Sequence, residues 1–187
     1  MLDWVLIEEG RIEEALTHLR AASALASRTG APVAEANALL VLAMAQVALA
    51  SLDEAARGCE RAVELARKAD DRTIERLALQ HLARHWADAW KWREALDTAT
   101  EALAFDDRSG TVDVRRTLLL MVRGEALLGL GNKAERIEQL DLAAREAESS
   151  GYEDGAVRAL GVLLEVSADA GLQARYDSAV MRLTTRT

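Results

Sequence analysis

The chain has 187 residues, a formal net charge of −8 and a single proline, and half of its residues are hydrophobic while only 4% are aromatic. This composition excludes an intrinsically disordered chain and a disulfide scaffold, and the length fits one domain or one array of repeats. Because no block of Lys and Arg offsets the acidic balance, we expect no direct contact with nucleic acid or with a membrane.

Cysteine content and the N-terminus point to a cytoplasmic protein. Cys59 is the only cysteine, so an intramolecular disulfide or a CxxC metal site is excluded and a reducing compartment is expected. Residues 1–10 carry Asp3 and two glutamates where a secretion signal needs positive charge followed by an apolar core. No apolar run reaches the ~20 residues that a membrane-spanning helix needs.

The apolar spacing predicts helices along the whole chain. Apolar residues recur at helical intervals, and turn signals such as the segments 29–32, 70–71, 106–110 and 149–151 separate them. Pro32 stands at the expected start of a helix, the position that tolerates proline. In chain order we predict ten helices, at roughly 2–9, 12–28, 33–50, 52–69, 72–89, 92–105, 111–129, 133–149, 153–169 and 172–184.

These helices belong to an internal repeat. The segments GRIEEAL, ASLDEAA, WKWREAL and GNKAERI align, which places Glu14, Glu54 and Glu94 at intervals of 40 residues and Glu135 after a further 41. A weaker copy begins at Gly171. We therefore predict one domain, residues 1–187, made of repeats at approximately 1–30, 31–70, 71–110, 111–151 and 152–187.

Small residues recur where the two helices of a repeat should cross. Ala15, Ala55 and Ala95 lie near the start of each second helix, and the columns of Ala43, Ala83 and Gly124 lie midway along each first helix. Small side chains allow close approach of helices. One helix pair cannot bury its own apolar face, so successive pairs must stack, and the predicted fold class is an all-α solenoid of antiparallel helix pairs.

The pattern resembles the tetratricopeptide repeat (TPR). That family has a small residue, a turn between the helices, Glu-Ala and then another Ala, and this order is followed here by Leu82-Ala83, Glu94-Ala95 and Ala102. The 40-residue period is similar to the long variant of the repeat found in kinesin light chains and in sensor regions of large bacterial transcriptional regulators. The resemblance implies a right-handed superhelix. Arg136 and Tyr176 depart from it, because they replace the small residue after the turn, and their helix pairs are expected to cross more widely or to shift.

The resemblance also implies a partner-binding groove, because the first helix of each TPR pair lines a concave face. Carried over onto this sequence, the groove residues are Trp4, Ile7, Leu40, Met44, Val47, Leu77, Gln80, Arg84, Asp88, Met121, Glu125 and Leu128. The N-terminal half of this set is apolar. An exposed apolar patch indicates an interaction site in which flexible methionines adapt to a partner, whereas strong curvature or self-association would bury it instead.

Other candidate sites are weaker than their structural explanations. His81 and His85 have an HxxxH spacing that suits zinc but lack a third ligand, so we expect interior histidines held by hydrogen bonds. Trp86 and Trp92 fit core aromatic columns, Trp90 at the turn is the expected exposed exception, and Cys59 is expected to be buried and inert. We predict no metal, no cofactor and no enzymatic activity.

The sequence favours a protein–protein interaction scaffold that holds a peptide or helix of a partner in its groove. Two alternatives stay open, a ligand-sensing segment of a larger signalling or transcriptional regulator and a self-assembling structural spacer. The short first helix and the uncapped last helix suggest a segment of a longer array or a homo-oligomer formed through the ends or the groove.

Overall fold

The computed structural model describes residues 9–110, 113–166 and 169–185, and regular structure in these ranges is α-helical. The helix predicted at 2–9 lies outside the described residues, with the groove residues Trp4 and Ile7. The helices are α2 (Ile12–Arg28), α3 (Pro32–Ala48), α4 (Leu52–Lys68), α5 (Arg72–Asp88), α6 (Trp92–Ser109), α7 (Val114–Gly129), α8 (Lys133–Ser150), α9 (Glu153–Leu164) and α10 (Ala170–Thr185).

Two predicted helix ends are wrong. The polar segment from Asp106 continues α6 to Ser109, and the left-handed residue Gly110, with φ of 67°, follows it. The helix predicted at 153–169 ends at Leu164. Asp169 caps α10 instead, because its Oδ1 accepts hydrogen bonds from the amides of Gly171 and Leu172 at 2.7 and 3.0 Å.

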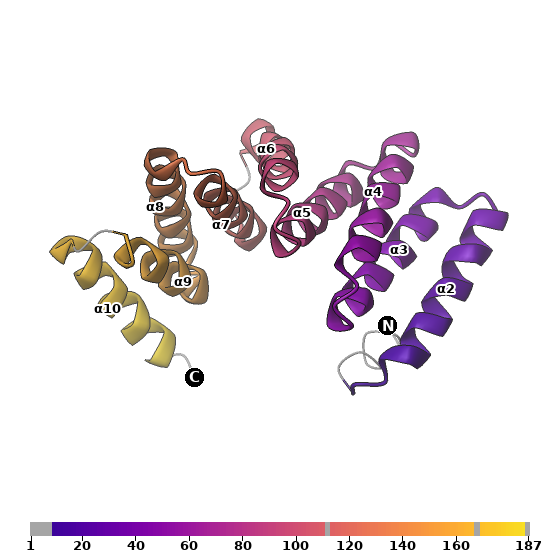
Figure 1. The fold of residues 1–187 in the computed structure, drawn as a ribbon, viewed down its shortest axis with the longest axis horizontal. Helices are drawn as coiled ribbons and strands as arrows, with labels where there is room; N and C mark the ends of the chain where they lie inside the picture. The colour runs from indigo at the N-terminus through magenta and orange to yellow at the C-terminus, as the bar shows by residue number, and fades with distance from the viewer. Residues whose placement is uncertain (1–8, 111–112, 167–168, 186–187) are drawn as a thin grey trace. The chain divides into compact units, whose positions relative to one another are not determined.

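The chain forms two compact units, unit 1 ending at Lys91 and unit 2 beginning at Trp92. In each unit every helix packs against the next one along the chain, in alternating directions (Figure 1). The first helices of successive pairs are also in contact, α3 with α5 in unit 1 and α7 with α9 in unit 2. The predicted all-α fold of stacked antiparallel pairs is therefore confirmed, while one continuous domain over 1–187 stays a prediction.

Most turns between helices contain one residue in the left-handed conformation, about one every 20 residues. Glycine occupies five of these positions and Ala50, Asp70 and Trp90 occupy three, with φ of 57°, 52° and 61°. Glycine adopts such a φ without the steric penalty that a Cβ atom brings. The same left-handed turn conformation thus recurs along the chain, although the residue that adopts it varies.

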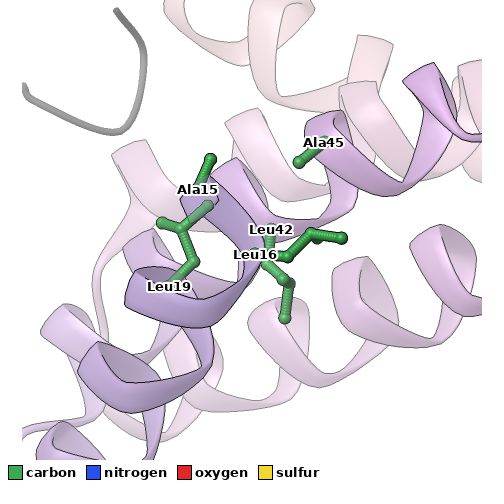
Figure 2. Packing of buried hydrophobic residues seen from close by; sticks show 5 residues of the cluster. All are labelled: Ala15, Leu16, Leu19, Leu42 and Ala45. Carbon is green, nitrogen blue, oxygen red and sulfur yellow. The ribbon is translucent and has the colours of Figure 1, made fainter. Parts of the chain in front are cut away.

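Alanine columns form the centre of each helix pair, as predicted. Ala15, Ala55 and Ala95 are fully buried, and so are Ala43 and Ala83. At the N-terminal end of unit 1, Ala15, Leu16 and Leu19 from α2 pack on Leu42 and Ala45 from α3 (Figure 2). Short side chains on both helices bring the backbones close, and leucines fill the space beside them.

Two glycines in α7 mark its closest contacts. A Cβ atom at Gly124 would lie 3.0 Å from the Leu140 side chain of α8, and one at Gly129 would lie 2.4 Å from the indole of Trp92. Gly124 thus has the predicted role of allowing close approach. The contact with Gly129 also agrees with the prediction that Trp92 is a packing residue.

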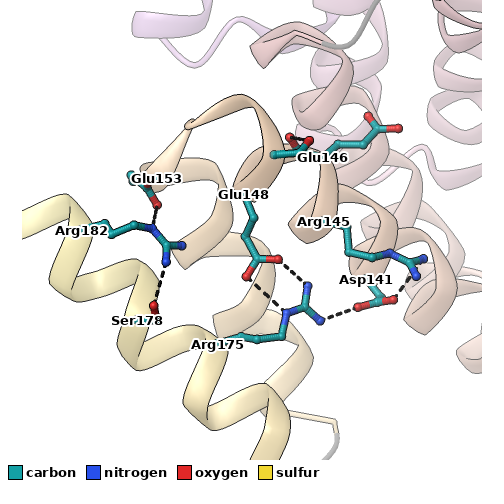
Figure 3. A network of polar contacts seen from close by, with 9 residues as sticks. Asp141, Arg145, Glu146, Glu148, Glu153, Arg175, Ser178 and Arg182 are labelled. Atoms are coloured by element: carbon teal, nitrogen blue, oxygen red, sulfur yellow. Dashed lines mark hydrogen bonds and ion pairs between the residues drawn. The ribbon is translucent and has the colours of Figure 1, made fainter.

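Helix α10 has little buried surface of its own and is joined to α8 and α9 by ion pairs. Ala179 is its one buried residue in the described part of the helix. The Arg175 guanidinium reaches Glu148 and Asp141 on α8, and Arg182 reaches Glu153 at the start of α9 with an N–O distance of 2.9 Å (Figure 3). Gly161 on α9 lies opposite Tyr176, so a glycine makes room where the repeat lacks its small residue.

Candidate functional site

The candidate site is the first-helix face of each unit, made of α3 and α5 in unit 1 and of α7 and α9 in unit 2. In unit 1, Met44 and Val47 on α3 are half-buried, and so are the α5 residues Leu77, Gln80, Arg84 and Asp88. These side chains combine packing inside the unit with a surface that a partner can touch.

An ion pair gives the α5 part of this face its polar character. Arg84 and Asp88, one turn apart, are joined by Nε–Oδ1 and Nη2–Oδ1 distances of 2.9 and 2.7 Å. Because each charge is neutralised by the other, the pair presents a dipole rather than a net charge, on the same helix as the half-buried apolar Leu77. This arrangement suits a partner with both apolar and hydrogen-bonding groups.

In unit 2 the first-helix face is more open. Leu128 near the end of α7 is 44% exposed, and Glu125, one turn earlier, is half-buried. An exposed leucine beside a carboxylate provides one apolar and one polar contact on adjacent turns. Leu128 is therefore the predicted groove residue of this unit with the most accessible apolar surface.

Leu40 and Met121 differ from the other predicted groove residues. They occupy the same column of the repeat but are only 3% and 4% exposed, so both are core residues in this structure. Their helices pack against several neighbours, α3 against α2, α4 and α5, and α7 against α6, α8 and α9, and this packing encloses both side chains. A partner binding to this surface would not reach either side chain directly.

His85 is buried as predicted but is not held by hydrogen bonds. It is 4% exposed, and neither ring nitrogen has a hydrogen-bond partner in the described structure. Burial, and secondly the neighbouring His81, lower the pKa of His85 to about 4. The ring is thus a neutral packing group, and the expectation of a hydrogen-bonded interior histidine is wrong for His85.

The aromatic residues and the cysteine lie where the sequence placed them. Trp90 is 76% exposed at its turn, whereas Trp86 is half-buried, with the Lys91 ammonium 4.4 Å from its ring centroid. Lys91 also pairs with Asp53 at 2.8 Å. Cys59 is fully buried, and burial raises the pKa of its thiol to about 12, so the predicted inert thiol is supported.

Within residues 9–110, 113–166 and 169–185, no three His, Cys, Asp or Glu side chains come together in a way that could hold a metal ion. Among the same residues, none of the helices combines the length and the apolar character needed to cross a bilayer.

Sequence reasoning missed the Arg175 bridge between α10 and α8. Its guanidinium donates to both carboxylate oxygens of Glu148, at 3.3 and 2.8 Å, and to Asp141 at 2.8 Å, which raises the pKa of Arg175. The sequence did contain an indication of this bridge, because Arg175 occupies the column in which the other copies have glutamate. A reversal of charge in a repeat column indicates a new partner on a neighbouring helix.

No protein-family model matches the sequence, and neither does any curated protein. Solved structures with TPR-like repeats are nevertheless similar in fold. A variant of a putative kinesin light chain of Podosopora anserina with nearly identical TPR-like repeats has a TM-score of 0.78 and 16% identity, covering 100% of this chain and 94% of its own. The chain therefore has a TPR-like repeat fold, and membership of the long-repeat variant stays a prediction.

Two Rap proteins share the same fold. The apo form of RapI has a TM-score of 0.84 and 11% identity over 98% of this chain and 66% of RapI. A Rap protein in complex with Competence and Sporulation Factor has a TM-score of 0.69 and 16% identity over 96% of this chain, which spans about half of that protein, 49%. At these identities the similarity is one of fold.

Proposed function

We propose that the chain is a non-catalytic binding module that holds a peptide or helix of a protein partner against its first-helix face. The observation that carries this proposal is the first-helix face itself, on which Met44, Val47, Leu77 and Leu128 keep apolar surface that the described helices leave accessible. Apolar surface of this kind on a repeat array is typical of helix-in-groove or extended-peptide recognition.

The structural neighbours support the same function. The Rap protein that shares the fold was solved in complex with Competence and Sporulation Factor, so that protein binds a factor. Here the half-buried Met44 on α3 provides a flexible, polarisable contact, and the Arg84–Asp88 pair on α5 provides polar groups. We expect a few apolar anchors to dominate the affinity.

The proposal is tested by comparing exposed apolar residues on and off the first-helix face. Leu128→Glu introduces a charge on the face, and Met181→Glu introduces the same charge at a 68% exposed position on α10. Both variants are expected to keep the wild-type circular dichroism spectrum, because neither side chain is buried. Partners captured from source-cell lysate and then purified are expected to bind wild type and Met181→Glu equally and Leu128→Glu at least ~10-fold more weakly.

A second pair of variants tests unit 1. Val47→Glu lies on the first-helix face, and Leu25→Glu is its control at a 54% exposed position on α2. Equal binding of the purified partner by both folded variants and by Leu128→Glu would place the binding surface elsewhere and refute the proposal.

A further inference from the structure

Unit 2 contains a cleft between two second helices, away from the first-helix face. Its volume is about 470 Å³, and α8 and α10 form its walls while α9 contributes the floor. The lining residues are Ile137, Glu138, Asp141, Leu163, Asp169, Gly171, Leu172 and Arg175.

A long side chain spans the gap between α10 and α8 beside the cleft. Arg175 makes that bridge to Asp141 and Glu148 (Figure 3). One turn toward the N-terminus of α10, Leu172 is shorter and Gly171 has no side chain, so the space between the helices stays open.

The cleft has an apolar interior. Leu163 at its floor is 1% exposed, Leu172 is half-buried, and Ile137 on the α8 wall is 40% exposed. Its volume lies toward the lower end of the roughly 300–1,000 Å³ of ligand sites and exceeds what one side chain fills. The cleft therefore has room for one long side chain together with part of its neighbours.

The charge at the rim is negative. The lining contains the carboxylates of Glu138, Asp141 and Asp169. Its single guanidinium, Arg175, is neutralised by Asp141 and Glu148, and Asp141 also pairs with Arg145 outside the lining. Glu138 has no ion pair or hydrogen bond through its side chain in the described structure. Asp169 uses Oδ1 for the first amides of α10. A bound anion would meet repulsion, and a neutral apolar group would desolvate Glu138 without compensation.

We propose that this cleft binds an arginine or lysine side chain of a protein partner, with the aliphatic stem against Ile137, Leu163 and Leu172 and the cationic head at Glu138. Long basic side chains combine an apolar stem with a charged end, which matches the two parts of the cleft. The net charge of −8 also attracts basic segments over long range. This site is separate from the first-helix face and goes beyond the function proposed for that face.

The isoleucines provide a direct probe of the cleft. The chain contains four of them, Ile7, Ile12, Ile74 and Ile137, and of the three that the structure describes only Ile137 lines the cleft. With 13C-labelled isoleucine methyl groups, we would titrate the full chain with the peptide acetyl-Ala-Leu-Arg-Leu-Ala-amide and with the same peptide carrying citrulline, the neutral isostere of arginine. The proposal expects a saturable shift of Ile137 with the arginine peptide, unchanged signals from Ile12 and Ile74, and at least ~10-fold weaker binding of the citrulline peptide.

Matched variants then separate the cleft from general electrostatics. Glu138→Gln is expected to weaken the arginine peptide about 5- to 10-fold, whereas Glu135→Gln, which removes the same charge one turn away on α8 and outside the lining, is expected to change binding less than ~2-fold. No shift of Ile137 at millimolar peptide, or equal binding of the citrulline peptide, would overturn the proposal. N-acetylarginine amide binding as tightly as the peptide would also overturn it, in favour of a small organic cation.

Discussion

The left-handed turns permit a stability test in which the expected sign reverses between two positions with the same backbone conformation. Ala50 and Gly30 are both exposed, both lie in unit 1, and both have a positive φ, 57° and 67°. A Cβ atom built at Gly30 would meet nothing within 4 Å, so Gly30→Ala changes backbone energetics without a steric clash. Ala50→Gly is the reverse substitution in the turn at the other end of α3.

The expected change in the free energy of unfolding results from two opposing effects, one on the folded state and one on the unfolded state. The left-handed conformation costs an L-residue roughly 1–2 kcal/mol, which Ala50→Gly removes. The added glycine makes the unfolded chain more flexible, which costs about 0.4–1 kcal/mol. We therefore expect Ala50→Gly to raise the free energy of unfolding by about 0.5–1 kcal/mol and Gly30→Ala to lower it by a similar amount.

Urea unfolding monitored by circular dichroism at 222 nm measures both changes. At an unchanged m value, the midpoint for Ala50→Gly should move to higher urea and that for Gly30→Ala to lower urea. The double variant should return close to the wild-type midpoint, because the two turns lie at opposite ends of the 17-residue helix α3. Destabilisation by Ala50→Gly would refute the argument, since it would mean that the Ala50 methyl group contributes more than the turn conformation costs.

Three further outcomes are expected from urea unfolding of other variants. Gly129→Ala should destabilise unit 2 by about 1–3 kcal/mol, since the new Cβ atom would lie 2.4 Å from the Trp92 ring. An unchanged free energy of unfolding would show that the ring moves freely. His85 has a pKa of about 4 in the folded state against 6.5 in the unfolded state, so the unfolded state binds the proton first, and the free energy of unfolding should fall by about 2–3 kcal/mol from pH 7 to pH 4. His85→Leu should lack this part of the pH dependence. An identical pH profile for wild type and variant would contradict a buried neutral His85. Arg175→Met should lower the free energy of unfolding by about 1–2 kcal/mol and make it less dependent on salt, because the bidentate pair with Glu148 is lost. An unchanged salt dependence would show that the pair is energetically neutral.

Helix positions were predictable because their signals are local. The start of α2 at Ile12, of α4 at Leu52 and of α6 at Trp92 follows from apolar periodicity, acidic first turns and turn residues spaced along the chain. The end of α9 was missed. Asp169 reads as one more helical residue until it is seen to accept hydrogen bonds from the first amides of α10.

Which groove residues are accessible was decided by contacts between helix pairs. Leu40 and Met44 lie one turn apart on α3, yet Leu40 is buried and Met44 is half-buried. Periodicity assigns both to the same side of the helix, and only the packing of the neighbouring helices on α3 separates them. The same reasoning holds for Met121, which is buried, and Leu128, which is exposed.

The sequence by itself determined the repeat, the helix pairs, the small residues at their crossings and the burial of Cys59, because the same residue types recur in the same columns of successive copies. Tertiary structure alone decided the Arg175 bridge and the cleft beside it. Both depend on the gap between α8 and α10, helices of different repeats whose separation is set by how each packs on α9. Local patterns determine which side of a helix is apolar, whereas distances between repeats arise from the packing of whole helices.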